Sequence, residues 1–201
     1  MAQGADVRGR RAGERRRADA ERNLAAIVSA ATECFARDPD ISMSDIAKAA
    51  DVARVTLYGH FASREDLLRA VLAASIAEGT NVVEEAAPAQ GPPAEAFARL
   101  IRTCWPLLNR FGSLHTAAQH ALTAEEVRRY HDEPMAHVER LIVRGREAGV
   151  FRADLPVDWL VTTVYSLLHA AADEAAAGRM IAESVGEILE KTLLGVLMPV
   201  R

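Results

Sequence analysis

The stretch Ser42–Phe61, which reads SMSDIAKAADVARVTLYGHF, constrains the fold of this chain more than any other part of the sequence. Ser42 is followed three residues later by Asp45, a variant of the capping box that begins a helix. Asp51 and Val52 then predict a turn before a second short helix. This second helix carries small, polar and aromatic residues in place of a full apolar stripe. Such a composition is typical of a helix that lies in the major groove of DNA.

The predicted second helix has an inner and an outer face. The inner face, formed by Val52, Leu57 and Phe61, is apolar and packs on the neighbouring helices. Arginine on the outer face is suited to guanine, and a valine or threonine methyl group to the methyl of thymine. Hydroxyl and imidazole groups suit phosphate oxygens, which fix the register of the protein on DNA. The residues left for the groove are Arg54, Val55, Thr56, Tyr58 and His60, joined by Arg64 in the first turn of the next helix.

Apolar periodicity and capping residues predict an all-α chain of about nine helices. We expect no strand and no internal repeat. Residues 1–17 contain Gly, Ala and Arg without periodicity, so we expect them to be disordered. The expected helices cover about 19–37, 43–50, 53–60, 64–85, 94–110, 113–121, a segment from 124 that Pro134 kinks or splits before Gly149, 156–177 and 180–197.

Several motifs resemble the N-terminal domain of the TetR family of transcriptional regulators. They are the helix that ends near Phe35, the segments SDIAKAADV and TLYGHF, and SREDLLRAV at Ser63–Val71. The resemblance covers about a quarter of the chain. It implies phosphate contacts by Thr56, Tyr58, His60 and Arg64, and base contacts around Arg54, Val55 and Thr56. Ser44 completes the predicted DNA-binding set.

The chain departs from the family pattern at three positions. Asp51 stands in the turn where the family usually has glycine, and Ala53 replaces the usual Ser or Thr at the start of the recognition helix. Gly59 replaces a commonly larger residue and lowers helix propensity by up to about 1 kcal/mol. These departures leave the predicted fold and DNA-binding role intact, and they prevent any operator sequence from being transferred from the family.

Charge separates the two ends of the chain. Residues 1–23 hold seven arginines and four acidic residues, although the whole chain has a net charge of −4. A basic front on an acidic body fits a DNA-binding end attached to a different domain, and a solubilising tail is the alternative. We therefore divide the chain into a basic arm over 1–17, a helix-turn-helix domain over 18–66 and a helical effector-binding and dimerisation domain over 67–201.

The C-terminal domain is predicted to form a homodimer through its last two apolar helices, since a helix-turn-helix protein needs two copies to read a palindrome. The alternative is that both apolar stripes pack within one subunit. The predicted interface residues are Leu160, Val164, Leu167, Ala171, Val185, Ile188, Leu189, Thr192 and Val196.

Aromatic and polar residues of the same domain are the candidates for an effector site. They are Trp105, Phe111, His120, Tyr130, His137, Trp159, Tyr165 and His169. His115, His120, His131 and His137 lack the i, i+4 spacing that places two imidazoles on one helical face, so we predict no metal site. We also predict no cofactor.

These features predict a cytoplasmic repressor that binds double-stranded DNA as a dimer and is released by a small effector. No apolar run reaches the length of a membrane span. An all-α enzyme is the first alternative, but the sequence shows no nucleophile motif and no Gly-rich phosphate loop. A protein that binds DNA without an effector is the second.

Overall fold

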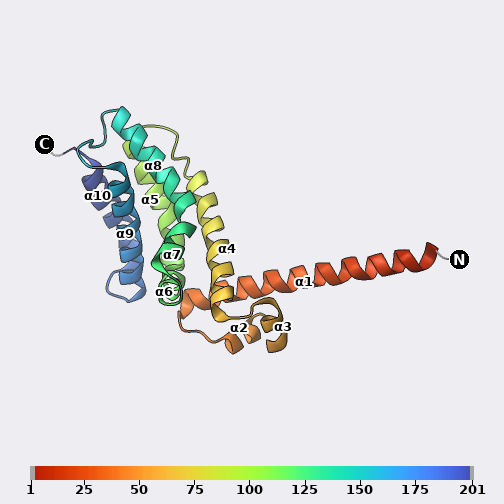
Figure 1. The fold of residues 1–201 in the computed structure, drawn as a ribbon. Coiled ribbons are helices and arrows are strands. Elements are labelled where there is room, and N and C mark those ends of the chain that lie inside the picture. The colour runs from red at the N-terminus through yellow and green to blue at the C-terminus, as the bar shows by residue number, and fades with distance from the viewer. Residues whose placement is uncertain (1–2, 200–201) are drawn as a thin grey trace. The chain divides into compact units, whose positions relative to one another are not determined.

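The computed structural model describes the backbone of residues 3–199 and the side chains of residues 20–199. Within this range all regular structure is helical, as predicted, and no strand occurs (Figure 1). The helices are α1 (Gln3–Arg37), α2 (Met43–Ala49), α3 (Arg54–His60), α4 (Arg64–Glu85), α5 (Pro93–Arg110), α6 (Gly112–Ala121), α7 (Ala124–Tyr130), α8 (Asp132–Glu147), α9 (Val157–Ala176) and α10 (Ala182–Leu197).

The tenth helix arises where the sequence predicts a kinked or split segment. α7 ends and α8 begins at His131, and Pro134 occupies the first turn of α8. Proline fits there because the first backbone N–H groups of a helix have no partner within it. Pro106 lies inside α5, which nevertheless continues to Arg110.

The beginning of α1 differs from the expectation. We expected residues 1–17 to be disordered, whereas the helix starts at Gln3. Arginine is the most abundant residue in this segment, and it has high helix propensity. The missing apolar period shows only that the segment has no face suited to packing, which does not exclude helical backbone.

The chain divides into two compact units, residues 1–71 and 72–201. In the first unit α1 packs on α2, and α2 packs on α3. Their contacts enclose a small apolar core in which each side chain is fully buried. It contains Ile27, Ala31, Phe35, Ile46, Leu57, Leu67 and Leu68. This core holds the inner face of α3 and leaves its outer face to solvent.

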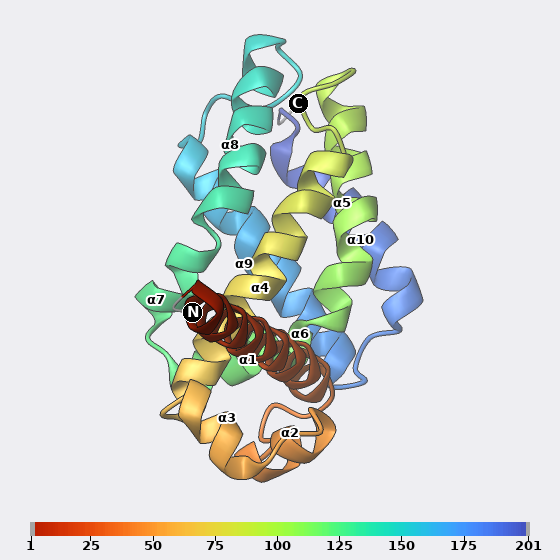
Figure 2. The ribbon, with the colours of Figure 1, turned by 90° about the vertical axis from the view of Figure 1, so that its right-hand side faces the viewer.

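In the second unit α5, α8, α9 and α10 lie side by side (Figure 2). α5 and α9 each pack on the other three helices, so these two form the centre of the group. The core includes Phe97, Leu100 and Ile101 from α5 together with Leu160 and Val164 from α9. Within the described residues no helix is both long and apolar enough to span a membrane.

Candidate DNA-binding surface and effector cavity

The start of α2 confirms the predicted N-cap. The Asp45 backbone N–H donates to Ser42 Oγ at 3.2 Å, and Ser42 Oγ donates in turn to Asp45 Oδ2 at 2.6 Å. Lys48 Nζ lies 3.0 Å from Asp45 Oδ1. The hydrogen bond from Ser42, followed by that from Lys48, lowers the pKa of Asp45. These contacts fix where the helix begins, since they satisfy backbone N–H groups that have no partner in the first turn.

Asp51 provides the turn between α2 and α3 in a left-handed conformation, with φ of 53°. The Asp51 N–H donates to Lys48 O at 3.1 Å, and the Val52 N–H donates to Ala47 O at 3.0 Å. This pair of bonds is the Schellman arrangement that ends many helices, with Asp51 in the place that glycine usually takes. Aspartate adopts left-handed backbone more readily than most residues, so the turn forms without glycine.

α3 presents the predicted outer face to solvent. Val55 is 79% exposed and Tyr58 is 41% exposed, whereas Leu57 is fully buried beneath them. Arg54 is also exposed, and its guanidinium lies 5.4 Å from the centroid of the Tyr58 ring. Thr56 and His60 are half-buried at the edge of this face. An exposed arginine, valine and tyrosine on one short helix can contact base edges and phosphates together.

α2 has a side-chain N-cap, whereas α3 has none. Ser44, a predicted DNA contact, is half-buried in the first turn of α2. Ala53, the N-cap of α3, has no side chain that can accept a hydrogen bond, so its carbonyl alone receives the Thr56 and Leu57 N–H groups, at 2.8 and 3.1 Å. The first N–H groups of α3 therefore remain available to an external acceptor such as a phosphate oxygen.

Arg64 has partners within the first unit. Its guanidinium donates to the carbonyl oxygens of Pro39 and Ile41 and lies 5.0 Å from the centroid of the Phe35 ring. It therefore ties the loop after α1 to the start of α4. A phosphate contact by Arg64 stays a prediction, and such a contact would have to share the guanidinium with these carbonyls.

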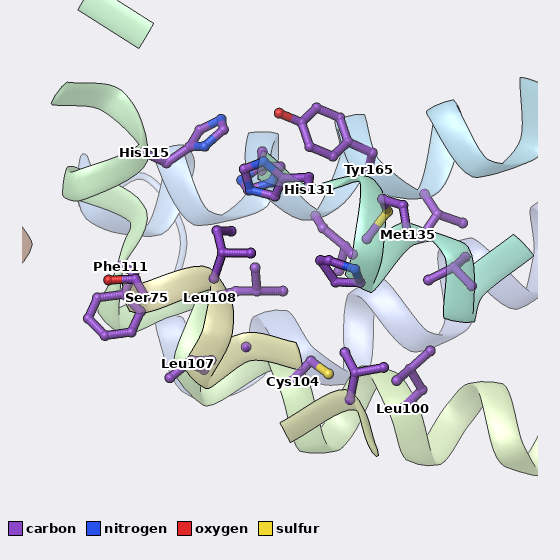
Figure 3. A pocket seen from close by; sticks show the side chains of 18 of the residues that line it. Ser75, Leu100, Cys104, Leu107, Leu108, Phe111, His115, His131, Met135 and Tyr165 are labelled. Atoms are coloured by element: carbon purple, nitrogen blue, oxygen red, sulfur yellow. The ribbon is translucent and has the colours of Figure 1, made fainter. Parts of the chain in front are cut away.

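The second unit contains a deep cavity. It comprises about 900 Å³ of space, a volume that includes the solvent at its open mouth. Most of its wall is aliphatic or aromatic and comes from α4, α5, α6, α8 and α9. The thiol of Cys104 is part of this wall, and burial raises its pKa to about 12. Figure 3 shows His115, His131 and Tyr165 along one side, and Leu107, Cys104 and Leu100 along the other.

Three histidines from three parts of the chain meet in the cavity wall. His115 lies on α6, His131 at the junction of α7 and α8, and His169 on α9, and all three are buried. The His115 and His169 rings stack with centroids 3.7 Å apart, and the His131 ring stands nearly perpendicular to both. We call these residues the histidine cluster. One ring nitrogen from each lies within 4.8 Å of the others.

Burial dominates the electrostatics of the histidine cluster. Desolvation, with a smaller repulsion from His131, lowers the pKa of His115 to about 4. Desolvation likewise lowers the pKa of His131 and takes that of His169 well below its usual range. Desolvation raises the pKa of the neighbouring Tyr165, over whose ring the Arg128 guanidinium lies at 4.5 Å. All three imidazoles are therefore neutral near pH 7.

The predicted effector residues divide between the cavity and other places. Phe111, Tyr165 and His169 line the cavity. Trp105 packs against Gly186 and donates its indole N–H to Ala182 O at 2.9 Å. The other four lie elsewhere than in the cavity wall; they are the exposed His120 and Trp159 and the half-buried Tyr130 and His137.

The histidine cluster as a set escaped the sequence analysis, which compared spacings along single helices. Tertiary packing of α6, α8 and α9 brings the residues together. Their sequence surroundings share no signal, because His169 lies among apolar residues whereas His131 is preceded by Arg129 and Tyr130 and followed by Asp132 and Glu133.

The predicted dimer residues also divide. Four of them are fully or nearly fully buried in the core of their own subunit, which corrects their assignment to an interface; they are Leu160, Val164, Val185 and Leu189. Leu167, Ala171 and Val196 are half-buried. Ile188 is 45% exposed and Thr192 is exposed, both on α10. The apolar stripes of α9 and α10 thus serve mainly the subunit's own core.

Comparison with known proteins identifies the first unit. The family described as "Bacterial regulatory proteins, tetR family" matches residues 27–71, which include α2, the Asp51 turn and α3. The chain is 28% identical over 182 residues to the HTH-type transcriptional repressor LfrR of Mycolicibacterium smegmatis. That alignment covers 88% of this chain and 92% of the relative.

Solved structures share the whole fold. The structure of LfrR from Mycobacterium smegmatis in complex with proflavine has a TM-score of 0.70 and 24% identity, covering 90% of this chain and 98% of that one. FadR from Bacillus subtilis in complex with stearoyl-CoA has a TM-score of 0.70 and 18% identity, covering 84% of this chain and 96% of that one. With the geometry of α2 and α3, the family match identifies residues 27–71 as a helix-turn-helix of the TetR type, and the solved structures show that the fold of the chain is shared.

Proposed function

We propose that this protein is a ligand-responsive repressor, which binds a palindromic operator as a homodimer and leaves it when a small molecule enters the cavity. The observation that carries the proposal is the presence of a deep apolar cavity in the same chain as an exposed recognition helix. The related LfrR is a repressor, and the structures of LfrR and FadR contain small molecules. These relatives support an effector for the present chain.

The cavity wall indicates the chemistry of the effector. No aspartate, glutamate, lysine or arginine of the described residues lines the cavity. A largely apolar molecule would fit, because it would leave no charge desolvated without a partner. Polar groups gather at one side, where Tyr165 and the histidine cluster offer aromatic faces and ring nitrogens. We infer an effector with an apolar body and one polar or aromatic end.

Dimer formation would use the outer surfaces of α9 and α10. Trp159 is 59% exposed near the start of α9, and Ile188 is 45% exposed in the middle of α10. Large apolar side chains in contact with solvent are common at homodimer interfaces. These residues replace the four buried positions of the sequence-based interface as the parts of the two helices that a second copy can reach.

The effector must bind more tightly to the form of the protein that does not bind the operator, or it will shift no equilibrium. α4 runs through the boundary of the two units, with Leu68 in the first and Ser75 in the cavity wall of the second. This helix is the covalent route by which occupancy of the cavity can affect the recognition helix.

The proposal is tested by fluorescence anisotropy with the DNA upstream of the protein's own gene. We expect salt-dependent binding of one dimer to a palindromic site, loss of sequence preference in Arg54→Ala, and weaker binding to all sequences in Tyr58→Ala. Trp159→Ala should weaken dimer formation and, through it, affinity for the palindrome, but it should leave the sequence preference unchanged, because its side chain belongs to the second unit.

The cavity is tested separately with Leu168→Trp, which fills it from α9. We expect this variant to be insensitive to any compound that releases the unmodified protein from DNA. DNA binding that spreads without a palindromic footprint, and that no cavity ligand alters, would instead favour a regulator that acts without an effector.

A further inference from the structure

We propose that His115, His131 and His169 form a binding site for one divalent transition-metal ion of the Zn²⁺ type, with its fourth coordination position open to the cavity. The ligand set is the histidine cluster, in which one ring nitrogen of each residue lies within 4.8 Å of the others. Three imidazoles with one open position are a known ligand set for Zn²⁺ in proteins. The proposal does not depend on the effector response, since it concerns binding of the ion alone.

The hydrogen bonds of His131 leave one nitrogen available. Its Nδ1 lies 2.9 Å from the carbonyl oxygen of Val127, one turn earlier. A carbonyl oxygen only accepts, so Nδ1 carries the proton and Nε2 keeps its lone pair. A histidine that ligates a metal usually donates its other N–H to a carbonyl or carboxylate in this way. Val127 therefore fixes the tautomer that a metal ligand requires.

His115 presents the complementary case. Its Nε2 lies 3.0 Å from the side-chain amide of Gln119, one turn later on α6. Its Nδ1 is buried and has no hydrogen-bond partner among the described residues. A buried nitrogen without a partner costs free energy, and coordination of a metal ion would remove that cost. The Gln119 amide nitrogen makes this contact and donates to Nε2, so coordination through Nδ1 requires the amide to turn over. The Gln119 oxygen then accepts from Nε2–H, which leaves the Nδ1 lone pair for the ion.

The distances call for a modest rearrangement. Metal–nitrogen bonds of about 2.0–2.1 Å place tetrahedral ligand atoms roughly 3.4 Å apart. The stacked rings of His115 and His169 must therefore tilt, so that their in-plane lone pairs converge on one point. Rotation about the side-chain bonds supplies this movement, because the rings border a cavity and not a fully packed core. Neutral imidazoles are available for binding near pH 7, without displacement of protons.

The chemistry selects a class of ion. Three nitrogen ligands without a carboxylate or thiolate suit Zn²⁺, Co²⁺, Ni²⁺ or Cu²⁺, and they do not suit Mg²⁺ or Ca²⁺, which prefer oxygen. The open position faces a wall that is otherwise apolar. The ion would therefore be the strongest local charge in the cavity, and it would attract a donor atom from a molecule that enters.

The test is titration of the chelator-treated full chain with Co²⁺, followed by its visible absorption. We expect one ion per chain with the intense spectrum of tetrahedral nitrogen coordination, and displacement of Co²⁺ by Zn²⁺ but not by Mg²⁺. His115→Ala, His131→Ala and His169→Ala should each lose the spectrum. His120→Ala and His137→Ala are matched controls, since they remove an imidazole from α6 and α8 outside the histidine cluster and should bind normally.

Two further measurements keep the proposal open to disproof if a cluster variant folds poorly. Gln119→Leu alters an exposed residue and should weaken Co²⁺ binding by about 10–100-fold. Zn²⁺ should raise the thermal midpoint of the unmodified chain until one ion is bound per chain. The proposal is overturned if the unmodified chain gives no tetrahedral spectrum, or if the cluster variants bind Co²⁺ as well as the two controls do.

Discussion

The segment from α2 to α3 and the cavity of the second unit are built in different ways. α2, its turn and α3 are defined by contacts between near neighbours, such as Ser42 with Asp45 and Val52 with Ala47. The cavity combines side chains from five helices, from Leu72 on α4 to His169 on α9. The helix-turn-helix therefore follows local chemical rules that a sequence displays, whereas the cavity depends on packing between distant segments.

The largest expected effect tests the distant packing. A Cβ atom at Gly145 of α8 would lie 1.9 Å from Cδ2 of Phe151, which in turn packs edge-on against Phe97 at 6.3 Å. Gly145→Ala should lower the free energy of unfolding by about 1–3 kcal/mol, because the phenyl ring must move within a packed core. Urea denaturation followed by circular dichroism measures the loss. Unchanged stability would show that this part of the second unit adapts easily.

An effect of comparable size tests whether the first unit depends on local contacts alone. Arg64→Ala removes hydrogen bonds to Pro39 and Ile41 and the contact with Phe35. We expect a loss of about 1–3 kcal/mol, typical of hydrogen bonds made by a charged donor. Arg69→Ala, which disrupts a surface pair with Asp66 at 3.0 Å, is the control and should cost at most about 1 kcal/mol. If the two variants unfold alike, Arg64 is not a structural tie.

Gly59→Ala provides the counterpart of Gly145→Ala in the recognition helix. No atom lies within 4 Å of the Cβ that it would add. Because alanine has the higher helix propensity, stability of the free protein should rise by up to about 1 kcal/mol. Thermal unfolding of the free protein measures this change. A loss of stability would mean that α3 needs the freedom of glycine, and the local account of this helix would then be wrong.

The smallest effect concerns pH. The hydrogen bond from Arg152 is the main cause that lowers the pKa of Asp154 to about 2. Since the folded pKa lies below the unfolded value, the carboxylate stabilises the fold above about pH 4, and this contribution disappears as the pH falls toward 2. Asp154→Asn should therefore be slightly less stable than the unmodified chain at pH 7 and equal to it near pH 2. If the difference in stability between the two proteins does not vary with pH, the ionised Asp154 carboxylate is not what stabilises the fold.

The contrast between local contacts and packing of distant segments explains which features could be predicted from the sequence. Capping pairs and prolines located most helices, including the break near Pro134, and the motif around Tyr58 indicated the family whose pattern matches residues 27–71. Leu160 and Val185 are buried in the subunit core, but the sequence could not distinguish them from interface residues. An apolar stripe has the same periodicity whether it packs within its own subunit or against a second one.

The predictions for Arg64 and the histidine cluster had a different limit. Arg64 was predicted to contact phosphate and His169 to bind an effector, whereas His115 and His131 were set aside because of their spacing. The partners of all four come from other parts of the chain. Arg64 bonds to carbonyls of the loop that follows α1, and His115 meets a histidine of α9. Backbone carbonyls leave no signal in the sequence, and helical spacing contains no information on contacts between helices.

Cys104 gives the cavity one further property. The thiolate, and not the thiol, attacks electrophiles and oxidants, and with a pKa of about 12 this side chain is almost entirely protonated at neutral pH. Oxidants and alkylating agents would therefore react only slowly with the Cys104 thiol. The same side chain can report occupancy, because a bound molecule would shield it from the slow alkylation that the open cavity permits.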